Sequence, residues 1–251
     1  MRVTSRHLYQ AWDVFLIMTV TLAAVEIPVR SVLDLGGTMA SMDWAVTSIL
    51  LLDILVRFRR PVRLQGRLVS SPDQVVAHYT KGWFWVDMPA ALPWPLLTGV
   101  PLLHFLQLLK LARVAVLLQQ WRQGDIHSAT VLRLCTFVYW LLLTAHWLAC
   151  GWLALGGINT ETDTFTRYLR ALYWCITTLA SVGYGDIIPS TNAQTAYAMV
   201  VMLLGVGVYG YVIGNVTTLL ANIDLAKTHY RESMERLMAF MRYRHIPSPL
   251  Q

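Results

Sequence analysis

The chain has 251 residues, of which 56% are hydrophobic and only 14% are charged, and its formal net charge is +6. Soluble domains carry charge on close to a quarter of their residues, so this composition excludes an ordinary soluble protein and favours an integral membrane protein. The basic excess is expected from loops on the cytoplasmic side of a membrane rather than from nucleic-acid binding.

Apolar runs of roughly 18–25 residues, long enough to cross about 30 Å of hydrocarbon, predict six membrane spans and one short re-entrant segment. The spans cover about residues 9–31, 42–58, 83–97, 102–120, 128–155 and 193–223, with the re-entrant segment at 168–180 and a charged amphipathic helix at 224–244. Asp13 and Glu26 interrupt the first run, which therefore predicts a retained helix rather than a cleaved signal peptide. Basic residues gather at both ends and in the loops after the second and fourth spans, which predicts that both termini are cytoplasmic.

A glycine-containing segment between the fifth and sixth predicted spans reads SVGYGD over residues 181–186. The stretch 168–190 is too short to cross a membrane and return as two helices, so it is either a re-entrant pore loop or an external surface loop. Gly183 and Gly185 can adopt positive φ without a Cβ clash, and an alternating backbone lets consecutive carbonyls point at one axis. Alone, the glycines would indicate a plain turn, but their place after a short apolar helix and between two spans favours a pore.

This segment resembles the selectivity filter of potassium channels, in which rings of backbone carbonyls replace the water around the ion. The resemblance implies a filter made of Ser181, Val182, Gly183, Tyr184 and Gly185, with K+ bound at the first four residues. Ser181 stands where the family usually has threonine, and its hydroxyl can still supply the innermost oxygen ring. The resemblance also implies four copies around one axis, and therefore a homotetramer.

Two aromatic side chains precede the filter at positions where related filters are held from behind. The resemblance implies that Tyr173 bonds Asp186 and that Trp174 bonds the hydroxyl of Tyr184 in a neighbouring subunit. The alternative is that both side chains only fill space in a buried helix. Tyr173 departs from the family, which more often has tryptophan at that position.

The first four spans carry a second signature. Residues 51–59, LLDILVRFR, and residues 81–87, KGWFWVD, resemble the cyclic-nucleotide-binding-domain channels, which include cyclic-nucleotide-gated, hyperpolarisation-activated and ether-à-go-go-type channels. The resemblance implies an all-α membrane protein of prokaryotic type with three parts. These are a voltage-sensor-like domain of four transmembrane helices (1–122), a two-helix pore domain (123–223) and the start of a cytoplasmic C-terminal linker (224–251).

Charged residues inside the predicted spans indicate the chemistry of the first domain, because acids at membrane depth are costly and mark partners. Asp53 and Asp87 are predicted to pair with cations of the fourth span, and the alternative is that both are solvated at the cytoplasmic interface. A comb of every third residue follows that span: His104, Gln107, Lys110, Arg113, Val116, Gln119 and Arg122. Only Lys110 and Arg113 are charged within the span, which predicts voltage sensing with a weak voltage dependence.

The sixth span supplies the gate candidates, which are Gly205, Gly207, Gly210, Val216, Leu220 and Ile223. Its glycines permit either a bend or close helix packing, and the sequence does not separate these. The three larger apolar residues can close a hydrophobic constriction that gates by dewetting. Residues 213–217 resemble the inner helix of cyclic-nucleotide-gated channels, and residues 230–244 resemble the first helix of their C-terminal linker.

These features predict a potassium-selective channel subunit in the cell membrane, with a bacterial inner membrane as the expected location, K+ in the filter and no organic cofactor. No nucleotide-binding domain precedes Gln251, so we expect a truncated form, with a natural short form as the alternative. Cyclic AMP or cyclic GMP is expected to act only through a domain absent here. Membrane lipids and further copies of the chain are the expected partners.

Three other functions are possible in principle. A poorly selective cation channel of the same fold is the alternative to a potassium channel. A six-span secondary transporter or membrane scaffold is the alternative from another class, and it predicts inverted repeats, which the two halves of the sequence lack. The scattered histidines form no catalytic constellation, so enzyme activity is not expected, and the cysteine spacing fits no zinc site.

Overall fold

The computed structural model describes residues 2–33, 40–64, 67–69, 71–124, 129–158 and 163–244. It divides into two compact units, Met1–Cys175 and Ile176–Gln251, whose boundary falls inside one helix. Helices dominate both units, as predicted. Over the described ranges, the exception is a short antiparallel hairpin in the basic stretch after the second helix, where Val62 lies opposite Val69.

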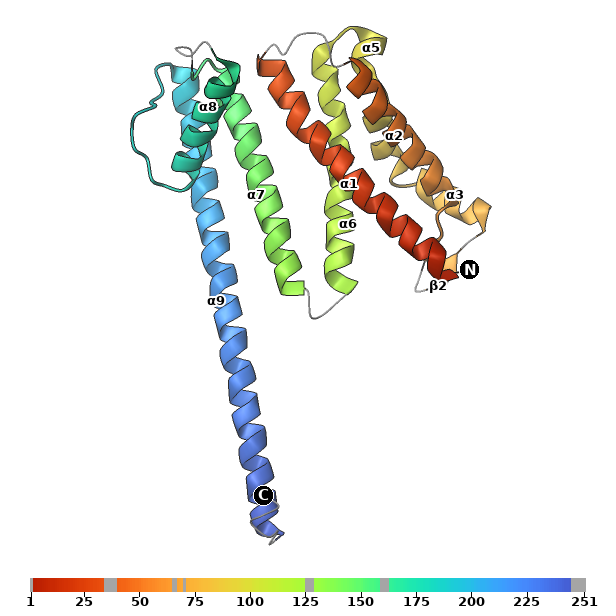
Figure 1. Ribbon diagram of the computed structural model, residues 1–251, viewed down its shortest axis with the longest axis vertical. Coiled ribbons are helices and arrows are strands. Elements are labelled where there is room, and N and C mark those ends of the chain that lie inside the picture. Colours follow the sequence, from red (N-terminus) through yellow and green to blue (C-terminus); the bar gives the residue numbers. More distant parts are fainter. Residues whose placement is uncertain are drawn as a thin grey trace. The chain divides into compact units, whose positions relative to one another are not determined.

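The first unit is built around α1 (Arg2–Leu33), which packs against α2, η1, α6 and α7 (Figure 1). The other elements of this unit, in chain order, are α2 (Ala40–Arg59), β1 (Val62–Leu64), β2 (Arg67–Val69), α3 (Pro72–Thr80), α4 (Phe84–Ala91), α5 (Trp94–Thr98), the 3-10 helix η1 (Pro101–Lys110), α6 (Leu111–Gly124), α7 (Ala129–Ala154) and most of α8 (Thr164–Leu179). A buried apolar core joins α1, α2 and α6 and includes Leu16, Val20, Leu50 and Val114.

Large apolar side chains also cover the outer faces of these helices. Met18, Leu55 and Leu142 are each more than 60% exposed. Exposed apolar side chains on long helices are typical of a membrane-facing protein, because lipid tails can cover them.

Four helical stretches of the described chain are long and apolar enough to cross a membrane: His7–Leu33, Leu102–Trp121, Leu132–Ala154 and Asn192–Gly214. They correspond to the first, fourth, fifth and sixth predicted spans. The second predicted span forms α2, which carries Asp43 in its first turn and Arg57 and Arg59 in its last. The structure therefore supports a multi-pass membrane protein.

The third predicted span, residues 83–97, is not one continuous helix, because the structure has α4 and α5 there with a break between them. The helix α4 ends at Ala91, and the C-cap residue Leu92 has an extended backbone with ψ 140°. Pro93 follows, and a proline disfavours helical backbone at the residue before it. A new helix, α5, begins at Trp94.

The short helix predicted at residues 168–180 is present as α8 and begins earlier, at Thr164. Asp163 caps it, because its Oδ2 accepts hydrogen bonds from the backbone N–H of Thr166 at 2.9 Å and from the Thr166 hydroxyl at 2.8 Å. These bonds hold the pKa of the exposed Asp163 carboxyl below its ordinary value.

The second unit contains the end of α8, the loop after it and α9 (Asn192–Tyr243). Thr191 and Gln194 cap the start of α9: Thr191 Oγ1 accepts from the Gln194 N–H at 3.2 Å, and Gln194 Oε1 accepts from the Ser190 N–H at 2.8 Å, one residue before the position used in a capping box. α9 continues without a break through the predicted sixth span and the separately predicted helix at 224–244 (Figure 1). No glycine or proline follows Gly214 within α9, so no helix-ending residue separates the two.

Candidate functional site

Alternate residues of the filter segment have a left-handed backbone. The φ angles are 55° at Ser181, 57° at Gly183 and 77° at Gly185. The prediction of positive φ at the two glycines is confirmed, and the alternation is the one that lets consecutive carbonyls turn toward the same side. Ser181 was not predicted to join them, because a residue with a Cβ takes positive φ only at a cost, and nothing in its sequence neighbourhood signals it.

The backbone amides of the filter segment turn back onto the last turn of α8. The N–H of Val182 donates to the Thr177 carbonyl at 2.8 Å, and the N–H of Gly183 donates to the same carbonyl at 3.2 Å. The N–H of Ser181 donates to the Thr178 carbonyl at 3.1 Å. The first three amides of this segment therefore bind carbonyls of the last turn of α8 and cap the C-terminal end of that helix.

Close packing explains why one of the gate candidates, residue 205, is a glycine. A Cβ added at Gly205 would lie 2.8 Å from the Leu179 carbonyl oxygen, so only glycine lets α9 pass the end of α8 there. Near Gly207 and Gly210 an added Cβ would meet no atom of the chain within 4 Å.

The helix continues through all three of these glycines. The backbone of α9 is also helical at the apolar gate candidates Val216, Leu220 and Ile223, whose side chains lie outside the described part of the chain.

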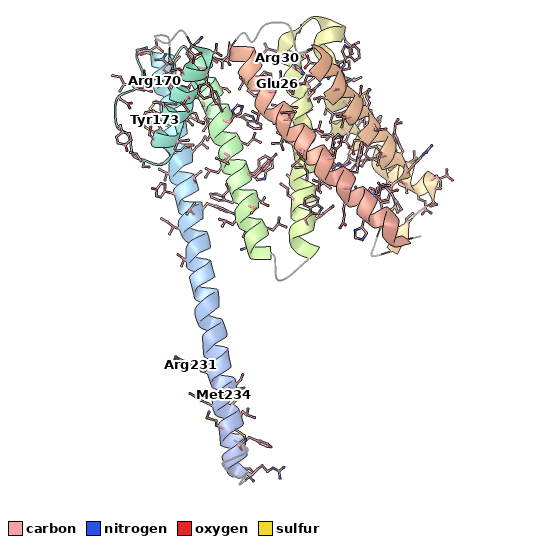
Figure 2. The ribbon with its side chains drawn as sticks, in the orientation of Figure 1. Glu26, Arg30, Arg170, Tyr173, Arg231 and Met234 are labelled. Atoms are coloured by element: carbon pink, nitrogen blue, oxygen red, sulfur yellow. The ribbon has the colours of Figure 1, made fainter. Side chains whose placement is uncertain are left out.

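The aromatic residues before the filter have different surroundings. Trp174 is buried and stacks on Trp152 of α7, with ring centroids 3.7 Å apart and an interplanar angle of 13°. This contact fastens α8 to α7. Tyr173 lies partly exposed on α8 (Figure 2), and Tyr184 is 71% exposed in the single chain. The bonds predicted for Tyr173 with Asp186, and for Trp174 with a neighbouring subunit, remain predictions.

The first half of the comb of the fourth span lies on a 3-10 helix. A 3-10 helix has three residues per turn, so His104, Gln107 and Lys110 lie above one another on one face of η1. These three and Arg113 are each at most 7% exposed. The sequence showed the three-residue spacing, but a regular α-helix would have spread these side chains around its axis. Val116 and Gln119 follow on α6, and the Arg122 side chain lies outside the described part.

Lys110 is the centre of a buried charge cluster. Its Nζ lies 2.8 Å from Asp53 Oδ2 and 3.0 Å from Asp87 Oδ1, and all three side chains are 0% exposed. Arg113 adds a second cation, with its Nη2 2.9 Å from Asp87 Oδ2. The predicted pairing of both acids with cations of the fourth span is therefore present, and the solvated alternative does not hold in this structure.

Further side chains complete this cluster, and sequence reasoning did not assign them to it. Trp12 Nε1 donates to Asp53 at 2.9 Å, and the Tyr79 hydroxyl donates to Asp87 at 2.6 Å. The Arg113 guanidinium lies over the Trp83 ring, 4.6 Å from its centroid. Each group supplies a donor or a π face to a buried charge, which the cluster needs in order to remain buried.

A second layer of pairs lies at the basic end of α2. Arg60 binds Asp13 with two hydrogen bonds of 2.6 and 2.8 Å, and Arg57 bridges Asp13 at 3.4 Å and Asp53 at 3.3 Å. Asp13 inside an apolar run was a signal for such a partner, but the sequence did not show which of the many arginines would meet it.

A smaller cluster surrounds His104 at the other end of α1. Arg30 lies beside Glu26 (Figure 2), with a distance of 3.2 Å, and beside Asp43 at 3.0 Å. Arg30 Nη2 also donates to His104 Nδ1 at 2.7 Å, and Gln107 donates to Thr47 at 3.5 Å. Every polar residue of the comb on η1 therefore has a partner on α1, α2 or α4.

Residues 9–227 match the ion transport protein family, and this matched range includes both the charge cluster and the filter segment. The chain is 30% identical to the voltage-gated inwardly rectifying potassium channel KCNH2 of Canis lupus familiaris, over 96% of this chain and 25% of that protein. It is 32% identical to the voltage-gated inwardly rectifying potassium channel KCNH6 of Gallus gallus, over 84% of this chain and 20% of that protein. The chain thus spans no more than a quarter of the length of these curated relatives. On the family match, this chain belongs to the ion transport protein family.

Proposed function

We propose that the chain is a subunit of a potassium-selective channel, in which four copies surround one axis and K+ binds at Ser181, Val182, Gly183 and Tyr184. The observation that carries the proposal is the alternation of left-handed residues over 181–185, with the amides held by α8. A potassium ion gives up its water only where oxygens replace it, and such a backbone can present a carbonyl at each step. The potassium channels among the relatives support the same ion.

The proposed membrane arrangement adds α2 and the α4–α5 pair to the four long apolar helices, which makes six crossings with α8 re-entrant and both termini cytoplasmic. The charges of α2 are compatible with this, because Asp53 is fully buried and paired with Lys110 rather than exposed to lipid. Residues 1–122 would then form the sensor-like domain, residues 123–223 the pore domain and residues 224–251 the start of a linker.

Within this channel, Tyr173, Trp174 and Asp186 are proposed to support the filter wall. The α9 residues Gly207, Gly210, Val216, Leu220 and Ile223 remain the proposed gate, and Gly205 is proposed to serve the packing of α9 on the end of α8. Control by cyclic AMP or cyclic GMP, through a domain outside this chain, is proposed from the resemblance of residues 230–244 alone.

Lys110 and Arg113 are the proposed sensing charges, and Asp53 and Asp87 are their countercharges. For either cation to move with its helix, it must exchange its buried acidic partner on α2 or α4 for another one. The neighbouring positions on η1 are Gln107 and His104, which carry no fixed positive charge. Moving one charge across the full field yields about 2.3 kcal/mol per 100 mV. Two cations per subunit should therefore give channel opening only a weak voltage dependence.

The experiment that tests the function is a reversal-potential measurement on the purified chain in lipid vesicles, with opposed potassium and sodium gradients. We expect the reversal potential to lie close to the potassium equilibrium potential, and empty vesicles provide the baseline. A reversal potential that follows sodium as closely as potassium would replace the proposal with a poorly selective cation channel of the same fold.

A further inference from the structure

A proline inside the first long helix leaves one backbone carbonyl without its usual donor. In a regular helix the N–H of residue 28 would donate to the carbonyl of Ala24, but Pro28 has no N–H. Ala24 and Pro28 are both buried. Within a membrane no water can replace the missing donor, and an unpaired carbonyl there costs several kcal/mol.

The missing donor comes from α7. The indole Nε1 of Trp147 donates to the Ala24 carbonyl at 2.9 Å. The next residue toward the N-terminus, His146, places its Nε2 3.0 Å from the carbonyl of Val25. Two adjacent side chains of α7 therefore bind the two adjacent carbonyls of α1 that lie one turn before the proline.

The contact with Val25 determines the tautomer of His146. A carbonyl only accepts, so the hydrogen must be on Nε2 of His146, and Nδ1 of the neutral ring is then an acceptor. The Tyr168 hydroxyl of α8 lies 2.8 Å from this Nδ1 and is its donor. Cys150 Sγ also lies 3.8 Å from Nε2. The result is a continuous chain of hydrogen bonds from Tyr168 through His146 to the backbone of α1.

We propose that Pro28 creates a docking site on α1 for His146 and Trp147, and that the His146–Tyr168 bond extends this attachment to α8, so that the first helix of the sensor-like domain positions the helix that leads into the filter. Tyr168 and His146 are positioning residues, since neither would touch the ion. The proposal rests on the proposed function for its consequence, but the bond network itself does not depend on that function.

The consequence concerns the stability of the filter. A binding site made of backbone carbonyls keeps its geometry only if the elements behind it are held in place. Bound ions favour the geometry that binds them by mass action, so a loosened filter should need more potassium to stay conductive. Loss of the Tyr168 bond should therefore act most strongly at low potassium.

The first test examines the network without any conduction. Nitrogen NMR of 15N-histidine-labelled protein in detergent should show His146, assigned by its loss in His146→Gln, as a neutral ring with the hydrogen on Nε2. Tyr168→Phe should shift the Nδ1 resonance of His146, because the hydroxyl that donates to it is removed. A ring with its hydrogen on Nδ1, or an Nδ1 resonance unchanged in Tyr168→Phe, would overturn the proposal.

The second test separates Pro28 from general packing. Trp147→Phe should lower the thermal midpoint of the purified protein, since the Ala24 carbonyl loses its donor. The same change made in the Pro28→Ala background should lower the midpoint clearly less, because alanine in place of the proline supplies the missing N–H. Equal losses in both backgrounds would show that Trp147 does not serve the proline site.

The third test measures conduction, with a control of the same chemistry. Tyr139 of α7 also bonds α1, through Thr21 Oγ1 at 3.0 Å, and neither partner of this bond belongs to α8. Tyr168→Phe should speed the decay of potassium current at low external potassium by roughly two- to tenfold, the effect of one buried hydrogen bond. Raising potassium should reverse it, and Tyr139→Phe should leave the decay unchanged.

The choice of variant at His146 gives a further check. His146→Gln keeps a donor for Val25 and an acceptor for Tyr168, so its decay should lie closer to wild type than that of His146→Leu. Equal decay in Tyr139→Phe and Tyr168→Phe, or an effect that potassium does not reverse, would contradict the positioning role. A wild-type chain that conducts no potassium would refute the proposed function instead, and the NMR result would still decide the network.

Discussion

The charge cluster of the first unit and the filter segment of the second are organised by different parts of the chain. Around Lys110, ordinary helices carry side chains that neutralise one another in a buried interior. In residues 181–185, the backbone itself takes uncommon dihedrals and its amides bind α8, while the side chains of Val182 and Tyr184 are exposed in the single chain. The first region should therefore be sensitive to charge, and the second to the presence of a Cβ.

The largest expected effect is in the filter. Gly183→Ala should abolish potassium conduction, because φ 57° disfavours any residue with a Cβ even though the space beside it is open. Vesicle flux of potassium measures the loss. Gly82→Ala, a change of the same size at a glycine without positive φ and with no close neighbour for the added Cβ, should leave the flux intact. Conduction by Gly183→Ala at the wild-type level would show that the left-handed backbone is not needed.

The charge cluster should respond most strongly to loss of one acid. Asp87→Asn leaves Lys110 and Arg113 buried with one carboxylate fewer, and should destabilise the fold by about 3–5 kcal/mol. Unfolding of the purified protein in detergent measures this. Glu232→Gln, which breaks the solvent-exposed pair with Arg236, should give no measurable change. An equal effect of the two changes would mean that burial does not distinguish the pairs.

Packing at the end of α8 gives an intermediate effect. Gly205→Ala should destabilise by about 1–3 kcal/mol, because its Cβ would meet the Leu179 carbonyl at 2.8 Å and backbone cannot easily move away. Gly207→Ala has no such neighbour in the chain and should be neutral or slightly stabilising, as alanine favours a helix. The unfolding midpoints of the two variants measure the difference, and equal values would remove the packing role of Gly205.

The charge cluster should also be a weak voltage sensor. Two cations in each of four subunits supply at most about eight elementary charges per channel. The gating charge obtained from the limiting slope of conductance against voltage should therefore be below about eight elementary charges per channel. Replacing Lys110 and Arg113 together by glutamine should flatten that slope in any channel that still assembles. A measured charge well above eight, or an unchanged slope in the double variant, would show that other residues move.

The smallest effect concerns the cap of α8. The pKa of Asp163 in the folded protein lies below its ordinary value of 3.8, so its carboxylate stabilises the fold at neutral pH. This contribution is lost as the pH falls through the folded-state pKa. Asp163→Asn should therefore have a slightly lower thermal unfolding midpoint than wild type at pH 7. The midpoints of the two proteins should become equal in acid. A difference that persists in acid would point to a contribution other than the carboxylate charge.

Features that depend on local backbone chemistry or on the cost of charge in a membrane could be predicted from the sequence. Gly183 and Gly185 indicated the left-handed positions, since glycine alone takes them freely. Asp53, Asp87 and Lys110 indicated their own pairing, because each would be too costly alone at that depth. The apolar runs likewise predicted the helices that are long enough to cross a membrane.

Features that require residues far apart in sequence to meet could not be predicted, because they depend on how the helices pack. Trp12 and Asp13 join the acid–base network of α2 because α1 packs across it, and no local pattern shows which arginine faces which acid. Pro28 reads as a helix breaker in the sequence, yet α1 continues through it because Trp147 supplies the donor that the proline lacks. In each case the local preference is outweighed by a partner that only packing brings into contact.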